Sequence, residues 1–414
     1  MTQSHQIRAI TAEEFPAFTQ VAGQAFLEPW QPEAVEFEQQ LVEFDRTFAA
    51  LDGEQMVGSA SVYSSRLAVP GGTVPAAGIT MVAVLPSYRR QGILTAIMEH
   101  LLTDAIGRHE PVAILFASEP GIYGRFGFGQ ASSHLRLRLG RGDGAFTGGA
   151  LPGLTEVRLR EAAPTALRAE LGAVYDAALP GRPGQLIRDD RWWHSMLADP
   201  VFARDGMSPL RCLLAEDDGG ARGYALYRTR PDWSDGLASG TLRIRELMAT
   251  DASATAALWR DLLSRDLVGE VHASVRPVDD PLLSLLADPR RARAGLSDGL
   301  WVRLTDLPAA LSQRSYAAEI DIVLEVADAR LPANAGRWRL RAGPDGHGGK
   351  ATCERTSAEA DVELTVQALG AGYLGSRIGQ LAAAGQIREL TPGSLGRLST
   401  AMSHDPAPWS CIIF

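Results

Sequence analysis

Apolar residues in the first third of the chain recur at the spacing of strands in some segments and of helices in others. Strand-like runs occur at residues 6–10, at 46–65 as two strands around the hairpin dipeptide Asp52-Gly53, at 77–85 and at 111–117. The last of these runs is apolar throughout, which is typical of a strand in the middle of a sheet.

Two helices are predicted among these strands. The first begins near Thr11, which precedes Glu14 by three residues at the spacing of a capping box, and the second spans about Gly92 to Ile106. Their apolar faces are formed by Phe15, Phe18 and Val21 in the first helix and by Ile93, Ile97, Leu101 and Leu102 in the second. The order hairpin, strand, helix, strand predicts a mixed α/β layer.

A similar order of elements follows the glycine-rich segment at residues 141–153, which has the composition of a domain boundary. The elements predicted there are strands at 210–215, 223–228, 241–249 and 270–275 and a helix at 252–265 capped by Asp251. The strand-to-helix junction of this second copy, MATDASATAALW, has neither an arginine pair nor a glycine. We therefore expect a duplicated fold in which the second copy has lost a ligand-binding turn.

From about Leu304 the composition changes again. Residues 320–346 and 353–370 alternate like strands and residues 371–390 have a helical pattern, so an α+β unit is expected. The last residues, PAPWSCIIF (406–414), are apolar to the end, and such a terminus is better buried than exposed. The predicted architecture is α/β with mixed sheets, in three domains at residues 1–150, 151–303 and 304–414.

Composition narrows the class of protein. Of 414 residues, 45% are hydrophobic and 21% are charged, as in ordinary globular proteins, and the net charge of −9 disfavours a nucleic-acid binder. No run of about 18 apolar residues suggests a membrane span, and the polar N-terminus has no signal core, so a cytoplasmic protein is expected. Three distant cysteines argue for reduced thiols, and no metal site is predicted, since His134 and His194 lack spaced partners.

The segment VAVLPSYRRQGIL (82–94) joins a strand-like run to a helix and carries candidate binding chemistry. Unpaired backbone N–H groups at a helix start hold the positive end of the helix dipole. Gly92 lets an anion approach the backbone, and Arg89 and Arg90 add charge-assisted donors. A pyrophosphate with an arm that lies along residues 82–84 fits this arrangement, and coenzyme A has that form. Two solvated arginines before a helix are the alternative.

The same residues resemble the acetyl-CoA signature of the GCN5-related N-acetyltransferases (GNAT), Arg/Gln-x-x-Gly-x-Gly/Ala. Arg89, Gly92 and Leu94 occupy its three places, and Leu94 departs from the small residue usual at the last. With SEPGIYGRFGFG (118–129), the three-part layout and the apolar end, essentially the whole chain resembles the enhanced intracellular survival (Eis) family of aminoglycoside-type acetyltransferases. This resemblance implies an active GNAT domain, a degenerate GNAT-like domain, a sterol-carrier-protein-like domain and a homohexamer.

The resemblance also assigns the residues that bind acetyl-CoA. Backbone N–H groups of Val82 and Val84 would orient the arm of the cofactor and the acetyl carbonyl, and Ser118 would seat the coenzyme near its sulfur. The remaining cofactor-binding residues are Arg89, Arg90, Gly92 and Ile93, of which the first three would hold the pyrophosphate.

Two catalytic residues follow from the same resemblance. Tyr123 is the candidate general acid for the leaving thiolate, because a phenol has a pKa of about 10, near that of a thiol. The alternative is a packed aromatic ring between Gly121 and Gly124. The α-carboxylate of Phe414 would reach the active site of the first domain. It is a weak base with a pKa of about 3.5, so we expect it to anchor the cation and relay a proton through water. A hydrophobic plug is the alternative.

Residues 28–45 contain six acids and no lysine or arginine, and most of these acids are expected on a solvated helix face. They are Glu28, Glu33, Glu36, Glu38, Glu43 and Asp45. Glu28 differs because it lies in a loop, where the resemblance places an acidic pocket residue. With Trp30 and Phe37 it would bind an ammonium group by ion pairing and ring contact. Some relatives carry an acid just before the terminal aromatic residue, where this chain has Ile413.

The resulting functional hypothesis is an acetyl-CoA-dependent N-acetyltransferase that acts on primary amines of polycationic small molecules, aminoglycosides among them, as in antibiotic resistance. Acetylation of lysine side chains or of polyamines is one alternative. A lipid-binding or hydrophobe-binding protein, resting on the last domain, is the alternative from a different class.

Overall fold

The computed structural model describes residues 5–147, 155–343, 351–375 and 377–414. Its contacts divide the chain into two compact units. The first comprises Met1–Ser132, Gly299–Asp405 and Ile412–Phe414, and the second comprises Ser133–Asp298 and Pro406–Cys411. The domain boundary expected near residue 150 falls within 148–154, outside the described residues.

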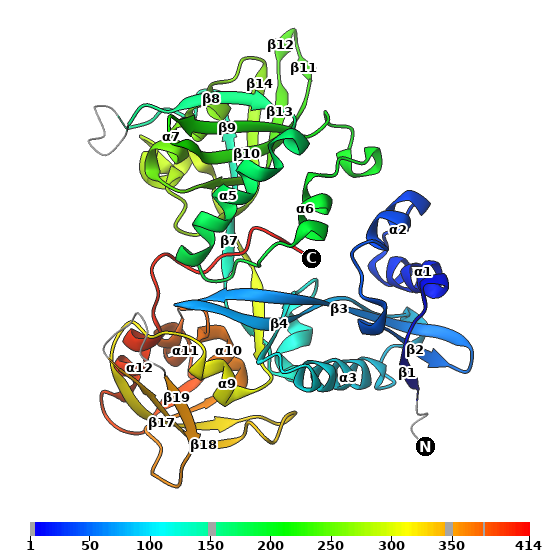
Figure 1. Cartoon of the computed structure of the whole chain (residues 1–414), viewed down its shortest axis with the longest axis vertical. Helices are drawn as coiled ribbons and strands as arrows, with labels where there is room; N and C mark the ends of the chain where they lie inside the picture. The colour runs from blue at the N-terminus through cyan, green and yellow to red at the C-terminus, as the bar shows by residue number, and fades with distance from the viewer. Residues whose placement is uncertain (1–4, 148–154, 344–350, 376) are drawn as a thin grey trace. The chain divides into compact units, whose positions relative to one another are not determined.

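The first unit contains a seven-stranded sheet in the order β1-β2-β3-β4-β5-β16-β6 (Figure 1). Its strands are β1 (Gln6–Ala9), β2 (Thr47–Asp52), β3 (Gln55–Val69), β4 (Gly72–Val84), β5 (Val112–Phe116), β16 (Leu300–Leu304) and β6 (Gly129–Gln130). Neighbouring strands are antiparallel except β4 and β5, which are parallel because a helix connects them. The strands predicted in the first third of the chain are therefore confirmed.

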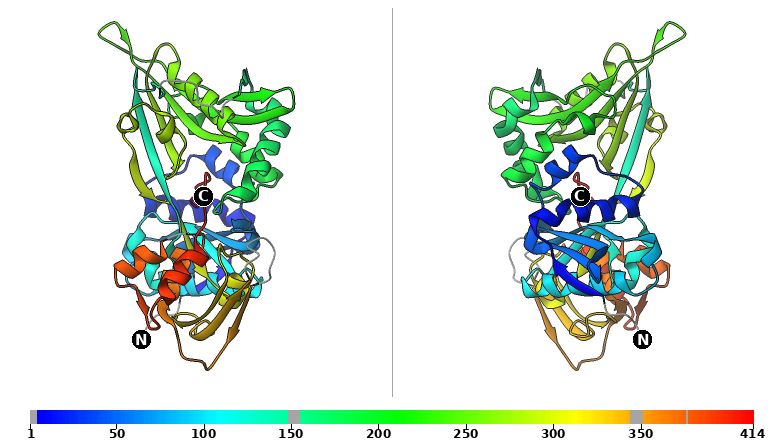
Figure 2. Two further views of the ribbon diagram at one scale, coloured as in Figure 1. Left: turned by 90° about the vertical axis from the view of Figure 1, so that its left-hand side faces the viewer. Right: turned by 90° about the vertical axis from the view of Figure 1, so that its right-hand side faces the viewer.

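Helices cover both faces of this sheet: α1 (Phe15–Phe26) and α2 (Pro32–Glu38) lie on one face and α3 (Ile93–Gly107) on the other (Figures 1 and 2). The capping box of Thr11 and Glu14 is present before α1. On α3 the predicted apolar face is buried, and Ile97 and Leu101 share a core with Val62 of β3. A short helix, α4 (Pro120–Tyr123), follows β5.

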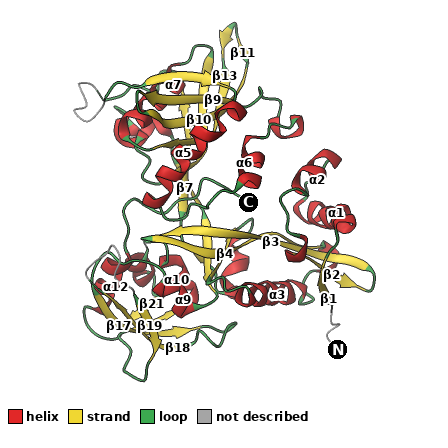
Figure 3. Cartoon of the chain, viewed as in Figure 1, coloured by secondary structure: helices red, strands yellow, loops and turns green. Residues whose placement is uncertain are grey.

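A five-stranded sheet in the order β19-β18-β17-β20-β21 completes the first unit, with helices beside its strands (Figure 3). Its elements are α9 (Leu307–Ser312), β17 (Ile320–Ala327), β18 (Gly336–Ala342), β19 (Thr352–Arg355), β20 (Val362–Thr365), α10 (Val366–Gly372), α11 (Ile378–Ala383), β21 (Ile387–Glu389) and α12 (Ser394–Met402). The helical prediction for residues 371–390 is wrong at its end. Gly385, with φ of +74°, turns the chain after α11, and β21 then pairs with β20.

The second unit repeats the strand–helix–strand order of the first. Its main sheet has the order β15-β7-β14-β13-β10-β9-β8. Strands β11 and β12, which lie between β10 and β13 in the sequence, form a separate two-stranded sheet. The strands are β7 (Ser133–Gly140), β8 (Arg158–Ala162), β9 (Arg211–Asp217), β10 (Gly220–Arg230), β11 (Trp233–Ser234), β12 (Leu237–Ala238), β13 (Gly240–Ala249), β14 (Val268–Pro277) and β15 (Gly295–Asp298). The helices are α5 (Arg168–Ala178), α6 (Asp190–Leu197), α7 (Ala252–Ser264) and α8 (Leu282–Leu285). The parallel pair β13 and β14, connected by α7, corresponds to β4 and β5, connected by α3.

Candidate active site

The turn between β4 and α3 has the geometry of an anion-binding helix start. Gly92 is the N-cap of α3 and has φ of +88°. No other atom lies within 4 Å of the position of a Cβ there, so the dihedral angle and not packing requires glycine. Arg90 also has positive φ, +64°, and the side chains of Arg89 and Arg90 are exposed. No side chain caps α3, so its first N–H groups are left without a side-chain acceptor, as at an anion-binding helix start.

The second half of β4 has an edge that does not pair with β5. The register of β4 and β5 covers only Ala76–Gly78, after which the two strands separate. On the other edge, the N–H of Leu85 donates to the carbonyl of Val57 at 2.9 Å. Alternation along an antiparallel ladder then directs the N–H group of Val84 away from β3, toward the unpaired edge, whereas Val82 lies at a register irregularity next to Met81, which has φ of +52°.

Two predicted site residues, Ser118 and Tyr123, follow β5 in the chain. Tyr123, at the end of α4, is buried in one core cluster with Ile93, and Val82 and Val84 pack against that cluster. Burial, with a smaller contribution from the charge of Glu119, raises the pKa of Tyr123 to about 12, which keeps the phenol protonated. Ser118, which follows β5, is exposed.

The end of the chain lies against three strands of the first sheet. The ring of Phe414 makes edge-on contacts with Phe116 of β5, at 5.5 Å between centroids, and with Tyr63 of β3, at 6.2 Å. A Cβ on Gly78 of β4 would lie 3.3 Å from Cε2 of Phe414. Gly78 is the last β4 residue that pairs with β5, so the terminal residue sits where the two strands separate.

Glu38 is linked to the chain end through Tyr63, which the sequence interpretation did not predict. The hydroxyl of the buried Tyr63 donates a hydrogen bond to the Glu38 carboxylate at the end of α2, and the ring of the same tyrosine contacts Phe414. Burial raises the pKa of Glu38, although the bond from Tyr63 opposes the shift. Tyr63 is 25 residues away in the sequence, so no local spacing marks this pair.

The prediction that most acids of residues 28–45 lie on a solvated helix face does not describe Glu38 and Glu43, which are half-buried. Glu43 is half-buried and accepts bonds from both the backbone N–H and the hydroxyl of Ser64, at 2.8 and 2.6 Å. The prediction holds for Glu33 and Glu36, which are exposed on α2.

Of the three predicted substrate residues, Trp30 lines the cavity between α1 and α2, whereas Glu28 and Phe37 do not. Trp30 is half-buried and lines a cavity of about 880 Å³ between α1 and α2, with Gln20, Val35 and Glu36 among the other lining residues. Glu28 is exposed, its backbone N–H donates to the carbonyl of Gly23 at 3.0 Å, and its side chain does not line this cavity. Phe37 is half-buried on α2 and also lies outside the lining of the cavity.

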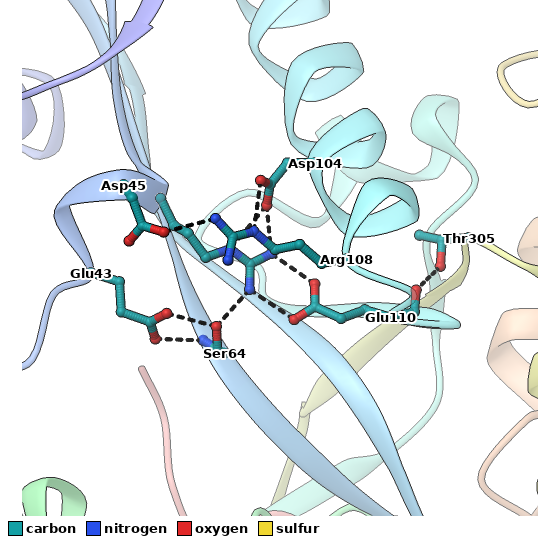
Figure 4. Close-up of polar contacts among 8 residues, drawn as sticks. Glu43, Asp45, Ser64, Asp104, Arg108, Glu110 and Thr305 are labelled. Carbon is teal, nitrogen blue, oxygen red and sulfur yellow. Dashed lines mark hydrogen bonds and ion pairs between the residues drawn. The ribbon is translucent and has the colours of Figure 1, made fainter.

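A buried ionic network joins β3, α3 and the loop before β5, and Figure 4 labels Ser64, Asp104 and Glu110 among its members. The fully buried side chain of Arg46 forms ion pairs with Asp104 at 2.6 Å and Glu110 at 2.7 Å, and donates to the hydroxyl of Ser64 at 2.8 Å. Ser64 follows Tyr63 in β3, so the network fixes the strand that carries Tyr63. Removing one member of such a buried ionic group costs about 3–5 kcal/mol of stability, which indicates a structural role.

The corresponding turn of the second unit is closed. Asp251 caps α7, and its carboxylate accepts from the backbone N–H of Ala254 at 3.0 Å and pairs with Arg222 at 2.8 Å. A carboxylate therefore occupies the position where α3 offers free N–H groups, and it would repel a phosphate. This observation agrees with the predicted loss of ligand binding in the second copy.

Three protein-family models match the chain. They are an acetyltransferase (GNAT) domain over residues 6–131, a second acetyltransferase (GNAT) domain over 184–304 and a sterol carrier protein domain over 307–411. Together with the fold and the turn at Gly92, these matches define an N-acetyltransferase of the GNAT class, whose fold implies acetyl-CoA as the acetyl donor.

Relatives specify the family further. An uncharacterized N-acetyltransferase of Streptomyces avermitilis is 45% identical over 90% of both chains, and the N-acetyltransferase Eis of Mycobacterium tuberculosis is 37% identical over 95% of this chain and 96% of its own. The crystal structure of Eis1 from Mycobacterium abscessus matches 99% of this chain and 100% of that chain, with a TM-score of 0.82 and 31% identity. The chain belongs to the Eis family of N-acetyltransferases, as its motifs predicted.

Two further features concern residues 5–147, 155–343, 351–375 and 377–414, the part of the chain that the structure describes. No helix in this part of the chain is long and apolar enough to cross a membrane. Within the same residues, no group of three or more histidine, cysteine, aspartate or glutamate side chains is arranged to hold a metal ion.

Proposed function

We propose that this enzyme acetylates primary amines of polycationic small molecules, aminoglycosides among them. The observation that carries the proposal is the position of the chain end, where β4 and β5 separate. There the aromatic rings of Phe414, Phe116 and Tyr63 meet, and the Glu38 carboxylate accepts a hydrogen bond from the Tyr63 hydroxyl. The α-carboxylate of Phe414 would add another negative charge. Carboxylates beside aromatic rings form a site for an ammonium group.

The residues that would hold acetyl-CoA follow the turn from β4 to α3. Val82 and Val84 would bind the arm of the cofactor along the unpaired edge, and Arg89, Arg90, Gly92 and Ile93 would bind its pyrophosphate. The exposed Ser118 would contact the coenzyme near its sulfur. Free N–H groups, positive φ at Gly92 and two exposed guanidinium groups fit a doubly charged anion.

Replacing both arginines should weaken coenzyme A binding without unfolding the protein. In Arg89→Ala with Arg90→Ala, the loss of two charge-assisted hydrogen bonds, each worth about 1.5 kcal/mol, should raise the Kd about 100-fold in calorimetry. The matched control is Arg290→Ala with Arg291→Ala, an adjacent exposed pair in the second unit. An unchanged Kd in the first variant would contradict the assignment.

Acetyl-CoA supplies the acetyl group as a thioester, and the residues of the chain would manage the charges of its transfer. As the amine nitrogen bonds to the carbonyl carbon, an N–H group on the free edge of β4 would stabilise the oxyanion. As the carbon–sulfur bond breaks, Tyr123 would give its proton to the thiolate, and the proton that the acylated nitrogen loses would return through water to restore the phenol. The terminal carboxylate of Phe414 would anchor the ammonium form of the substrate and pass its proton to water.

Glu38 would supply the second negative charge of the amine site. Glu38→Gln preserves an acceptor for the Tyr63 hydroxyl but removes the charge, so the KM of a polycationic amine should rise about tenfold, the equivalent of about 1.4 kcal/mol. The KM of acetyl-CoA should not change. Glu33→Gln, an exposed residue on the same helix, is the control, and equal effects in both variants would exclude a specific role for Glu38.

Glu28, Trp30 and Phe37 would form the outer part of the substrate site. Trp30 lines the cavity between α1 and α2 and would offer a ring face to a cation, and Glu28, two residues earlier in the sequence, is exposed to solvent.

The homohexamer implied by the family resemblance is tested by sedimentation of the purified protein.

Thiol release from acetyl-CoA distinguishes the candidate substrates. We expect release with an aminoglycoside that exceeds release with spermidine and with a lysine peptide at equal concentration. Faster release with spermidine or the peptide would favour the polyamine or lysine alternative. No release with any amine would favour a lipid-binding role for the sterol carrier protein domain.

A further inference from the structure

The second unit binds the segment that precedes the chain end through alternate residues. Residues 406–411 belong to this unit. The backbone N–H of Ala407 donates to Asp279 at 2.9 Å, and its carbonyl accepts from Arg182 at 2.7 Å. Arg182 and Asp279 also form an ion pair at 2.7 Å, so both polar backbone groups of Ala407 are held by one pair of side chains.

Trp409 is held next to this pair. Its backbone N–H donates to the carbonyl of Pro183 at 2.9 Å, and its ring is buried with the guanidinium group of Arg276 at 5.2 Å from the ring centroid. The backbone of Gly184 approaches so closely that a Cβ would lie 2.9 Å from the carbonyl oxygen of Trp409. This contact admits only glycine on the opposing segment.

Cys411 ends the series in a buried ionic cluster. Its thiol lies 3.0 Å from Oε1 of Gln185 and 3.2 Å from Nη2 of Arg188. Arg188 forms an ion pair with Glu246 at 2.5 Å, and both side chains have no exposed surface. The hydroxyl of Tyr224 also donates to Glu246.

This arrangement is more specific than burial of an apolar terminus requires. Two fully buried charges cost several kcal/mol of desolvation each, and a well-packed apolar group would cover the segment at lower cost. Buried ionic groups of this kind can select one register of the chain. The second copy also has no use for a ligand at its own turn, because Asp251 closes it.

We propose that the second GNAT domain binds residues 407–411 as a clamp and thereby positions Phe414, three residues further along the chain, for catalysis. The proposal rests on the role of the Phe414 carboxylate proposed above. The clamp consists of Arg182, Asp279, Gln185, Arg188 and Glu246, which all belong to the second unit and are not among the proposed substrate-binding residues; they are positioning residues. Misplacement of a catalytic group by about 1 Å can reduce the rate about 100-fold, so a loosened terminus should be costly.

Arg182→Ala in the full-length enzyme tests the clamp at a partly exposed position, so the fold should survive. We expect kcat to fall about tenfold with an unchanged KM for acetyl-CoA, and carboxypeptidase to release Phe414 about tenfold faster. Arg182→Lys should restore most of both properties. The control is Arg160→Ala, which breaks a partly exposed ion pair with Glu216 in the same unit.

Trp409→Ala serves as a second variant, with circular dichroism to verify its fold, and should show the same pattern. If both variants keep full kcat and slow release of Phe414, the clamp is refuted. A C-terminal extension separates this failure from failure of the proposed function. If the extension abolishes turnover while the clamp variants remain active, the role of Phe414 stands and only the clamp is lost. If the extended enzyme is also fully active, both are lost.

Discussion

Extension of the chain by a few residues after Phe414 is expected to abolish turnover while coenzyme A still binds. The added peptide bond converts the terminal carboxylate into a neutral amide, which cannot anchor an ammonium group. It also adds chain directly after the terminal residue, whose ring contacts Phe116 and Tyr63 and lies close to Gly78. We expect a loss in kcat of at least about 10³-fold, since charge and placement fail together.

Steady-state assays with an aminoglycoside and calorimetry with coenzyme A measure the two parts of this prediction. The Kd of coenzyme A should be unchanged, because the turn at Gly92 lies outside the contacts of Phe414. The same added residues placed before Met1 are the control for the extension itself. An extended enzyme with full kcat would show that the terminal residue is a hydrophobic plug.

Tyr123→Phe is expected to reduce kcat about 10³-fold without a change in the Kd of coenzyme A. The substitution removes the proton that the departing thiolate would receive and preserves the ring that packs against Phe128. Because burial raises the pKa of Tyr123 to about 12, the acid form persists as pH rises and is lost only near that pKa. The wild-type rate should therefore show no loss from this group up to about pH 10.

Single-turnover assays across this pH range test the role of Tyr123 directly. Tyr316→Phe, which removes the hydroxyl of another buried tyrosine that donates to a backbone carbonyl, is the matched control. If Tyr123→Phe and the control have equal kcat, the hydroxyl of Tyr123 has only a packing role. A larger effect on KM than on kcat would point to substrate binding instead of proton transfer.

Much of the fold could be predicted because its signals are local. Strands β1 to β5, the capping box at Thr11 and the buried face of α3 follow from the period of apolar residues and from neighbouring polar caps. The helix expected over residues 371–390 failed where Gly385 turns the chain and Ile387 enters a sheet. Pairing with a distant strand decided that segment, and local periodicity contains no information about such a partner.

The sequence by itself determined strands β1 to β5, helices α1 and α3 and the turn at Gly92, because dihedral preference and residue spacing act over a few neighbouring residues. Only the tertiary structure decided which groups meet at the site. Glu38 reaches Tyr63 across 25 residues, and Phe414 reaches Phe116 only through the folding of the whole chain. Cys411 meets Arg188 across 223 residues. Such contacts depend on the packing of the sheets, and no spacing along the chain encodes them.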